Sequence, residues 1–224
     1  WVYKLKKTVH GTKQAGRNWF KAFIKPILAF EGTKQCDVDT CLFVCERGDS
    51  ILFIGINVDN LFTMSNDEPL REQFIDSLES HFVLEHLGLL RWSLGMEINQ
   101  NLDLGYTTID QSLFIENTLK EYNWWDKGTI GCKPIPCPVE NEIDTTPLPI
   151  IGSHEQKTMN QLPVRSAACK FLYAAENTRP DIKLACGKLS RHLHNPAMVH
   201  WKMVIHLAGY LRSTLNHGIV YTRL

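Results

Sequence analysis

Two apolar runs of the chain are separated by a short polar segment. Residues 51–56 are mostly large and apolar, residues 57–60 read Asn-Val-Asp-Asn, and residues 61–64 are again mostly apolar. This arrangement predicts a buried β-hairpin whose polar residues form the turn. Asp and Asn tolerate left-handed backbone geometry and suit such a turn. The segment is therefore interpreted either as a turn alone, or as a turn at which Asp59 offers a carboxylate to a divalent metal ion.

Helical periodicity is present on both sides of this hairpin. A helix is predicted to open after Gly11, with an apolar stripe at helical spacing made of Trp19, Phe20, Phe23, Ile24, Ile27 and Leu28. Pro26 lies in that stripe and should kink or end the helix near Lys25. A strand is expected over residues 40–45. After the hairpin, Asn66 or Asp67 can cap a helix whose apolar residues recur every fourth position: Leu70, Phe74, Leu78 and Phe82.

The second half of the chain predicts one further hairpin and a set of helices. Residues 91–98 are expected to form a strand, residues 99–105 a turn and residues 106–109 the partner strand, with a helix near residues 114–122. Residues 133–163 contain six of the ten prolines without periodicity, which indicates a linker or an extended strap. Three helices should follow, one from about Pro163, one from Pro180 and one around Trp201–Leu211.

Together these elements predict an α+β fold with an antiparallel sheet and packed helices. We expect a mixed unit over residues 1–132, a proline-rich linker over residues 133–162 and a small helical unit over residues 163–224. Residues 1–10 are interpreted as a strand or the approach to one.

Composition narrows the class of protein. The chain has 224 residues, of which 44% are hydrophobic and 21% charged, as in soluble globular proteins. No apolar run approaches the roughly 20 residues that cross a bilayer, so no membrane association is expected. Seven scattered cysteines argue against a disulfide framework and for a reducing compartment. An intracellular protein, cytoplasmic or nuclear, is expected, and the chain resembles a segment of something longer.

Net charge is zero, but basic residues gather at the two ends. Residues 1–25 carry seven Lys or Arg and no acid, and residues 179–224 carry seven against Asp181 alone. Such ends are consistent either with binding of a polyanion such as nucleic acid or with ordinary solvated helix faces.

Several segments, in order along nearly the whole chain, resemble the reverse transcriptase of Ty1/copia-type retrotransposons. Residues 4–7 and 11–20 (KLKK, GTKQAGRNWF) resemble KLKKALYGLKQAPRAWY, residues 39–43 (DTCLF) resemble DPSLF, and residues 57–60 (NVDN) resemble the YVDD polymerase motif. Later matches are LG and LGMEI within residues 87–98, CKP at 132–134, and NTRPDI, LSR, NP and HWK between residues 177 and 202.

The resemblance implies a polymerase palm around the hairpin, followed by a helical thumb or connection region. It implies a site in which carboxylates hold two Mg²⁺ ions, and Asp59 matches a catalytic, metal-binding Asp. Lys13, Gln14 and Arg17 match the segment that the family places beside the incoming nucleotide and the template–primer. The implied partners are an RNA or DNA template–primer, dNTP and the remainder of a longer polyprotein.

The sequence departs from the family at the motif itself. Asn60 stands where the family has its second catalytic Asp, and an amide oxygen carries no charge to offset a metal ion. The other catalytic Asp of the family belongs to an upstream strand, which is expected to precede residue 1. We therefore expect this chain, as given, not to polymerise DNA.

Two alternatives remain open at this point. The chain could be a non-catalytic nucleic-acid-binding or scaffolding module derived from a retroelement. It could also be an active polymerase subdomain whose missing carboxylate comes from a longer chain or a partner.

Overall fold

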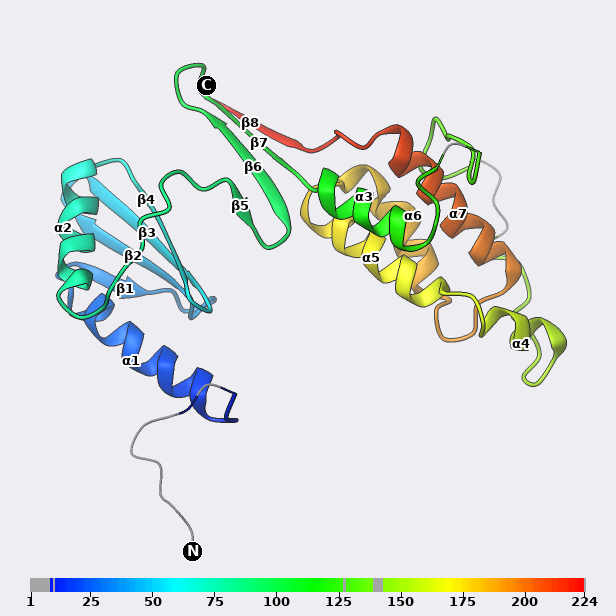
Figure 1. The fold of residues 1–224 in the computed structure, drawn as a ribbon, viewed down its shortest axis with the longest axis horizontal. Coiled ribbons are helices and arrows are strands. Elements are labelled where there is room, and N and C mark those ends of the chain that lie inside the picture. The colour runs from blue at the N-terminus through cyan, green and yellow to red at the C-terminus, as the bar shows by residue number, and fades with distance from the viewer. Residues whose placement is uncertain (1–8, 10, 127, 139–142, 224) are drawn as a thin grey trace, which may run out of the picture. The chain divides into compact units, whose positions relative to one another are not determined.

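The computed structural model describes residues 9, 11–126, 128–138 and 143–223, and the chain forms two compact units, residues 1–88 and 89–224. The strand expected over residues 1–10 therefore lies almost entirely outside the described residues. Antiparallel sheets and helices occur in both units (Figure 1). The predicted α+β class is confirmed.

The first unit is a four-stranded antiparallel sheet with helices on one face. Its strands, in spatial order, are β1 (Thr33–Gln35), β2 (Leu42–Arg47), β3 (Ser50–Asn57) and β4 (Asn60–Ser65). Helices α1 (Ala15–Ala29) and α2 (Glu68–Glu79) pack on the face that carries Phe43, Leu52 and Ile54. This core is fully apolar, as the alternation along β3 requires. On the opposite face, Phe53 and Met64 are paired neighbours and remain exposed.

The sequence predicted that Pro26 kinks or ends the first helix near Lys25, and the helix does not end there. Helix α1 continues to Ala29, and Pro26 is buried in its interior. Proline removes one helical hydrogen bond, and its ring crowds the backbone carbonyl four positions earlier, which here is that of Ala22. Burial of Phe23 and Ile27 against the sheet holds the last turn in place in spite of that loss. Helix α2 begins as expected, because Asp67 accepts a hydrogen bond from the backbone of Leu70 at 3.3 Å.

The second unit combines another antiparallel sheet with a helical core. Its strands, again in spatial order, are β5 (Trp92–Ser93), β6 (Met96–Asn101), β7 (Tyr106–Asp110) and β8 (Ile219–Thr222). The helices are α3 (Ser112–Glu121), α4 (His154–Met159), α5 (Val164–Asn177), a 3-10 turn at Pro180–Ile182, α6 (Lys183–Ser190) and α7 (Met198–Ser213). One buried cluster that includes Ile115, Phe171 and Leu207 joins α3, α5 and α7.

The segment expected to form a single strand over residues 91–98 is instead a tight hairpin. Strands β5 and β6 pair on either side of Leu94 and Gly95, whose φ angles are 52° and 74°. Glycine adopts a positive φ without strain, so the chain can reverse its direction at Gly95. The sequence pattern of residues 91–98 did not indicate this turn. Strand β8, which no pattern predicted, pairs with β7 through only four residues.

The compact units divide between Gly88 and Leu89, whereas the sequence placed its boundary at residue 132. Helix α3 lies before residue 132 in sequence but shares its core with α5 and α7. It therefore belongs to the second unit, and the boundary between the units lies before it. The proline-rich stretch over residues 133–162 includes α4 and buries Met159 and Ile143. Its first part lies along α7, because side chains of that helix, Ser213 and His206, bind the carbonyl oxygens of Lys133 and Ile135.

Candidate metal and nucleic-acid site at the β3–β4 turn

The predicted hairpin is present, and its turn consists of Val58 and Asp59. Strands β3 and β4 pair from Leu52 and Ser65 up to Asn57 and Asn60. Val58 has a φ of 54°, which is unusual for a β-branched residue. Such a conformation costs on the order of 1–3 kcal/mol and persists only where surrounding structure fixes it. The turn is therefore a strained, defined feature of the first unit.

Trp19 fixes this turn from the side of α1. Its indole N–H donates a hydrogen bond to the carbonyl oxygen of Val58 at 3.3 Å. The Trp19 ring stacks on Phe23, with centroids 5.2 Å apart, and meets the edge of Phe82 at 5.8 Å. The second turn of α1 is thereby held beside the hairpin. Sequence reasoning placed Trp19 in the apolar stripe and in a family motif two residues after Arg17, and neither assignment predicted its contact with the turn.

Asp59 is exposed at the tip and, within the described part of the chain, its carboxylate forms no hydrogen bond or ion pair. Asn60 beside it is also exposed. Two more acids, Asp37 and Asp39, lie in the β1–β2 loop at the same end of the sheet, which the bond from the Ile56 N–H to the Cys41 carbonyl places there. Asp39 already accepts a hydrogen bond from the Cys41 backbone at 2.8 Å.

The donor set at this tip does not fit a two-metal centre. Among the residues that the structure describes, no three His, Cys, Asp or Glu side chains gather closely enough to hold a metal ion. Two Mg²⁺ ions require several hard, anionic oxygen ligands, and the turn itself offers the Asp59 carboxylate with the neutral amide of Asn60 beside it. Asp59 is therefore placed where a metal ligand could act, without the companions that the family site requires.

Lys13, Gln14 and Arg17 lie at the beginning of α1 and are all exposed. Gln14 occupies the position that precedes the helix, and its side chain makes no capping hydrogen bond. The link from Trp19 to the turn brings this end of α1 to the same region of the unit as Asp59. No bond from these three side chains to the hairpin is found among the described residues. They are available to a ligand.

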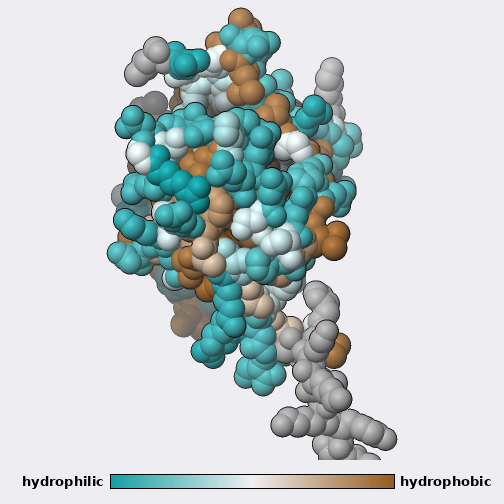
Figure 2. Space-filling model, turned by 90° about the vertical axis from the view of Figure 1, so that its left-hand side faces the viewer, coloured by the Kyte–Doolittle hydropathy of each residue, from teal (hydrophilic) through white to brown (hydrophobic). Residues whose placement is uncertain are grey.

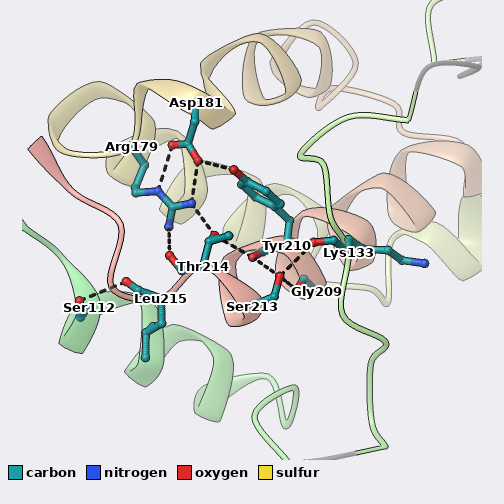
Figure 3. Close-up of polar contacts among 9 residues, drawn as sticks. All are labelled: Ser112, Lys133, Arg179, Asp181, Gly209, Tyr210, Ser213, Thr214 and Leu215. Atoms are coloured by element: carbon teal, nitrogen blue, oxygen red, sulfur yellow. Dashed lines mark hydrogen bonds and ion pairs between the residues drawn. The ribbon is translucent and has the colours of Figure 1, made fainter.

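A second cluster of family-motif residues, in the 89–224 unit, is of a different kind. Arg179 is fully buried and binds both carboxylate oxygens of Asp181, at 3.0 and 2.7 Å (Figure 3). It also donates to the carbonyl and hydroxyl oxygens of Thr214, at 3.0 and 2.7 Å. The Tyr210 hydroxyl donates to Asp181 at 2.8 Å. We call Arg179, Asp181, Tyr210 and Thr214 the arginine clamp.

Electrostatics within the arginine clamp favour the ionised carboxylate. Burial acts to raise the pKa of Asp181, but hydrogen bonds from Arg179 and Tyr210 outweigh it, so this pKa lies below its ordinary value. Burial and the bond to Asp181 raise the pKa of Tyr210. A bidentate Arg–carboxylate pair with its remaining donors satisfied is a strong structural tie. The clamp joins the 3-10 turn at Pro180–Ile182 to the end of α7.

The basic residues of the C-terminal stretch are largely engaged within their own unit. Beyond Arg179, Lys183 pairs with Glu176 at 2.9 Å and Arg191 with Asp144 at 3.6 Å. Arg212 donates to the carbonyl oxygens of Asp126 and Ile130, at 2.9 and 2.5 Å. This engagement supports the interpretation of residues 179–224 as structural and solvated helix faces. The basic residues of α1, in contrast, form no ion pair among the described residues.

Sequence comparison assigns the chain to a family. Residues 1–138 match the family described as reverse transcriptase (RNA-dependent DNA polymerase). Since this match covers more than half of the chain, the chain belongs to that family, and the resemblance drawn from its motifs is confirmed.

Individual relatives agree with this assignment. The chain is 30% identical over 220 residues to the retrovirus-related Pol polyprotein from transposon RE1 of Arabidopsis thaliana, and 28% identical over 222 residues to that from transposon TNT 1-94 of Nicotiana tabacum. These alignments cover 98% of this chain but 14% and 16% of the relatives. The putative transposon Ty5-1 protein of Saccharomyces cerevisiae is 23% identical, with 68% of its length covered. No solved structure matches the chain.

Within the described residues, no helix combines the length and the apolar character that crossing a bilayer requires.

Proposed function

We propose that this chain is the portion of a copia-type reverse transcriptase that carries the polymerase hairpin, and that in its present sequence it binds nucleic acid without polymerising DNA. One observation carries the proposal. Asp59 is a single exposed carboxylate at the tip of the β3–β4 hairpin, and its neighbour in the motif is the amide Asn60. The family chemistry needs more than one carboxylate, because both Mg²⁺ ions must be bound and neutralised.

Nucleic-acid binding is supported by the exposed side chains at the beginning of α1. Arg17 and Lys13 can contact phosphate oxygens, the first in a bidentate manner and the second as a point charge. Trp19 holds this end of the helix beside the hairpin turn, so a template–primer bound there would lie near Asp59. A dNTP and the remaining parts of a polyprotein are the further partners that the family assignment suggests.

Primer extension tests the catalytic part of the proposal. The 224-residue chain is incubated with a primed RNA template, dNTPs and Mg²⁺ or Mn²⁺, next to Asp59→Ala and Asp49→Ala. Asp49 is a matched control, since it is an exposed aspartate in the β2–β3 turn at the other end of the same sheet. We expect no extension by any of the three. Extension that Asp59→Ala abolishes and Asp49→Ala preserves would show that the remaining carboxylate suffices.

Binding is tested separately by fluorescence anisotropy with an RNA–DNA duplex over a salt series. Log affinity should fall linearly with log salt, and Arg17→Ala should reduce the slope by about 0.9 if Arg17 neutralises one phosphate. Lys34→Ala, at an exposed position on β1, should leave the slope unchanged. Absence of duplex binding at low salt would remove the nucleic-acid part of the proposal and leave the catalytic part standing.

An active subdomain completed by another chain is the second candidate. Asp59 is exposed and free, and the hairpin is ordered around it, so the tip could accept a carboxylate supplied from elsewhere. Adding the upstream segment of a full polyprotein in trans, and finding extension only with that addition, would favour this candidate.

A further inference from the structure

Helices α1 and α2 carry opposite charges on their outer faces. Arg17, Lys21 and Lys25 follow one another at four-residue intervals on α1 and are all exposed. Residues four apart share one face of a helix, and this face lies opposite the buried Phe23 and Ile27. We call these three side chains the basic ridge.

Helix α2 repeats the arrangement with acids. Glu68, Glu72, Asp76 and Glu79 are exposed and lie opposite the buried stripe of Leu70, Phe74 and Leu78. We call them the acidic ridge. Glu68 pairs with Arg71, and Glu79 contacts His86 at 2.7 Å. Glu72 and Asp76, in the middle of the ridge, form no ion pair within the described chain.

The two ridges lie next to each other on one side of the first unit. Both helices cover the same face of the sheet, and Phe30 at the end of α1 meets Phe74 of α2 with ring centroids 5.3 Å apart. Trp19 lies on the other side of α1, since it stacks on the buried Phe23 and bonds the hairpin turn, so the two ridges would meet a partner mainly through their charges. Figure 2, which views the molecule from the side on which α2 lies in Figure 1, shows a mainly hydrophilic surface with smaller apolar areas.

We propose that this surface docks on a second copy of the chain, with the basic ridge of each copy against the acidic ridge of the other. A two-fold axis that lies in the interface and runs between α1 and α2 brings both pairs of opposite ridges together at once. This is the isologous arrangement that most homodimers use. A polyanion that covered the whole surface is the weaker fit, because the acidic ridge beside α1 would repel it. Nucleic acid bound at Lys13 and Arg17, at the beginning of α1, would leave Lys21 and Lys25 for the second copy.

The size of the surface predicts a weak dimer. Helices of 15 and 12 residues are about 22 and 18 Å long, and two of them side by side are about 20 Å wide. The footprint of about 400 Å² is below the roughly 800 Å² per partner of a standard stable complex. Exposed ion pairs add little affinity each and are screened by salt. The dimer should therefore form at high protein concentration and low salt.

Sedimentation equilibrium of the 224-residue chain tests the proposal with two charge-reversed variants. One is Lys21→Glu with Lys25→Glu, and the other is Glu72→Lys with Asp76→Lys. The wild type should dimerise at low salt and dissociate at high salt, and each variant alone should associate at least about tenfold more weakly, because like charges then face each other. Mixing the two variants should restore the dimer, since both ridge contacts become complementary again in the mixed pair.

A matched mixture controls for the opposite net charges of the two variants. Lys34→Glu with Lys202→Glu makes the same charge change at exposed positions on β1 and α7. Its mixture with Glu72→Lys, Asp76→Lys should not restore association. Recovery in the first mixture also shows that both variants are folded. A wild type that stays monomeric at low salt, or equal recovery in both mixtures, would overturn the proposal. A third outcome would also overturn it. If the variant with Lys21→Glu and Lys25→Glu lost RNA–DNA duplex binding while its sedimentation stayed unchanged, the basic ridge would be assigned to nucleic acid.

Discussion

The β3–β4 turn and the arginine clamp are both built from segments that resemble family motifs, yet their side chains are used in opposite ways. At the turn, Asp59 is exposed and unpaired among the described residues, and the backbone of Val58 is strained. In the clamp, Arg179 is fully buried and each polar partner is engaged. A motif in the sequence therefore does not by itself distinguish a residue kept for a ligand from a residue kept for the fold.

The largest effect is expected when the clamp is broken. Asp181→Ala removes the partner of a fully buried arginine and should destabilise the second unit by about 3 kcal/mol, because an uncompensated buried charge remains. Denaturant unfolding followed by the tryptophans measures this change. Glu176→Ala, which removes the exposed partner of Lys183, should cost under about 1 kcal/mol. Equal effects of the two substitutions would contradict the assigned role of the clamp.

A close contact beside the clamp should be nearly as sensitive. A Cβ atom at Gly209 would lie 2.2 Å from the carbonyl oxygen of Gly131, a backbone atom that cannot move aside cheaply. Gly209→Ala should therefore destabilise the unit by about 2 kcal/mol, in the range typical of overpacking. Thermal unfolding measures the loss. Gly187→Ala in α6, where a Cβ meets nothing within 4 Å, is the control and should be neutral or stabilising.

Lowering the pH should weaken the clamp, and Asp181→Asn should abolish this pH dependence. The folded pKa of Asp181 lies below its ordinary value of 3.8, so its contribution to stability is present above that value and is lost as pH falls through the folded pKa. The difference in unfolding free energy between wild type and Asp181→Asn should therefore shrink as the pH is lowered below about 4. A difference that is constant with pH would show that the carboxylate charge is not what stabilises the fold.

The turn should respond in the opposite direction. Val58→Gly removes the cost of a positive φ in a β-branched residue and should stabilise the first unit by up to about 1 kcal/mol, after the entropy of glycine is subtracted. Hydrogen exchange of β3 and β4 reports on this unit directly. Val38→Gly, at an exposed loop position without positive φ, should bring no such gain. Destabilisation by Val58→Gly would mean that the strain is smaller than its backbone angle indicates.

The smallest effect is expected at Asp59 itself. Asp59→Asn should change the unfolding free energy by less than about 0.5 kcal/mol, as is usual for an exposed residue without partners. Urea unfolding of wild type and variant side by side measures it. A loss of unfolding free energy above about 1 kcal/mol would show that the carboxylate stabilises the turn, so that it could not be called free to bind a ligand.

The sequence predicted the elements that have a single clear period. The β3–β4 hairpin, the capped α2 and the helices that became α5 and α7 were all expected at nearly their observed positions. It failed where a local signal competed with burial: Pro26 continues a helix because Phe23 and Ile27 anchor it. It also failed at Leu94 and Gly95, where an apolar run hid a turn.

The candidate site was predictable in part. Asp59 could be placed on a turn from its neighbours alone, whereas the bond from Trp19 to Val58 joins residues 39 positions apart that no local pattern connects. The buried role of Arg179 was hidden for the same reason, since Thr214 lies 35 residues away. Charge counting along the chain treated Arg179 and Arg17 alike, although one is buried and the other exposed.

The segment that lies along α7 has a consequence for how the second unit opens. The carbonyl oxygens of Ile130, Lys133 and Ile135 are bound by side chains of α7, namely Arg212, Ser213 and His206. Because backbone carbonyl groups removed from water need hydrogen-bond partners, the path of this segment depends on α7. Unfolding of α7 should therefore release the segment, whereas release of the segment need not unfold α7.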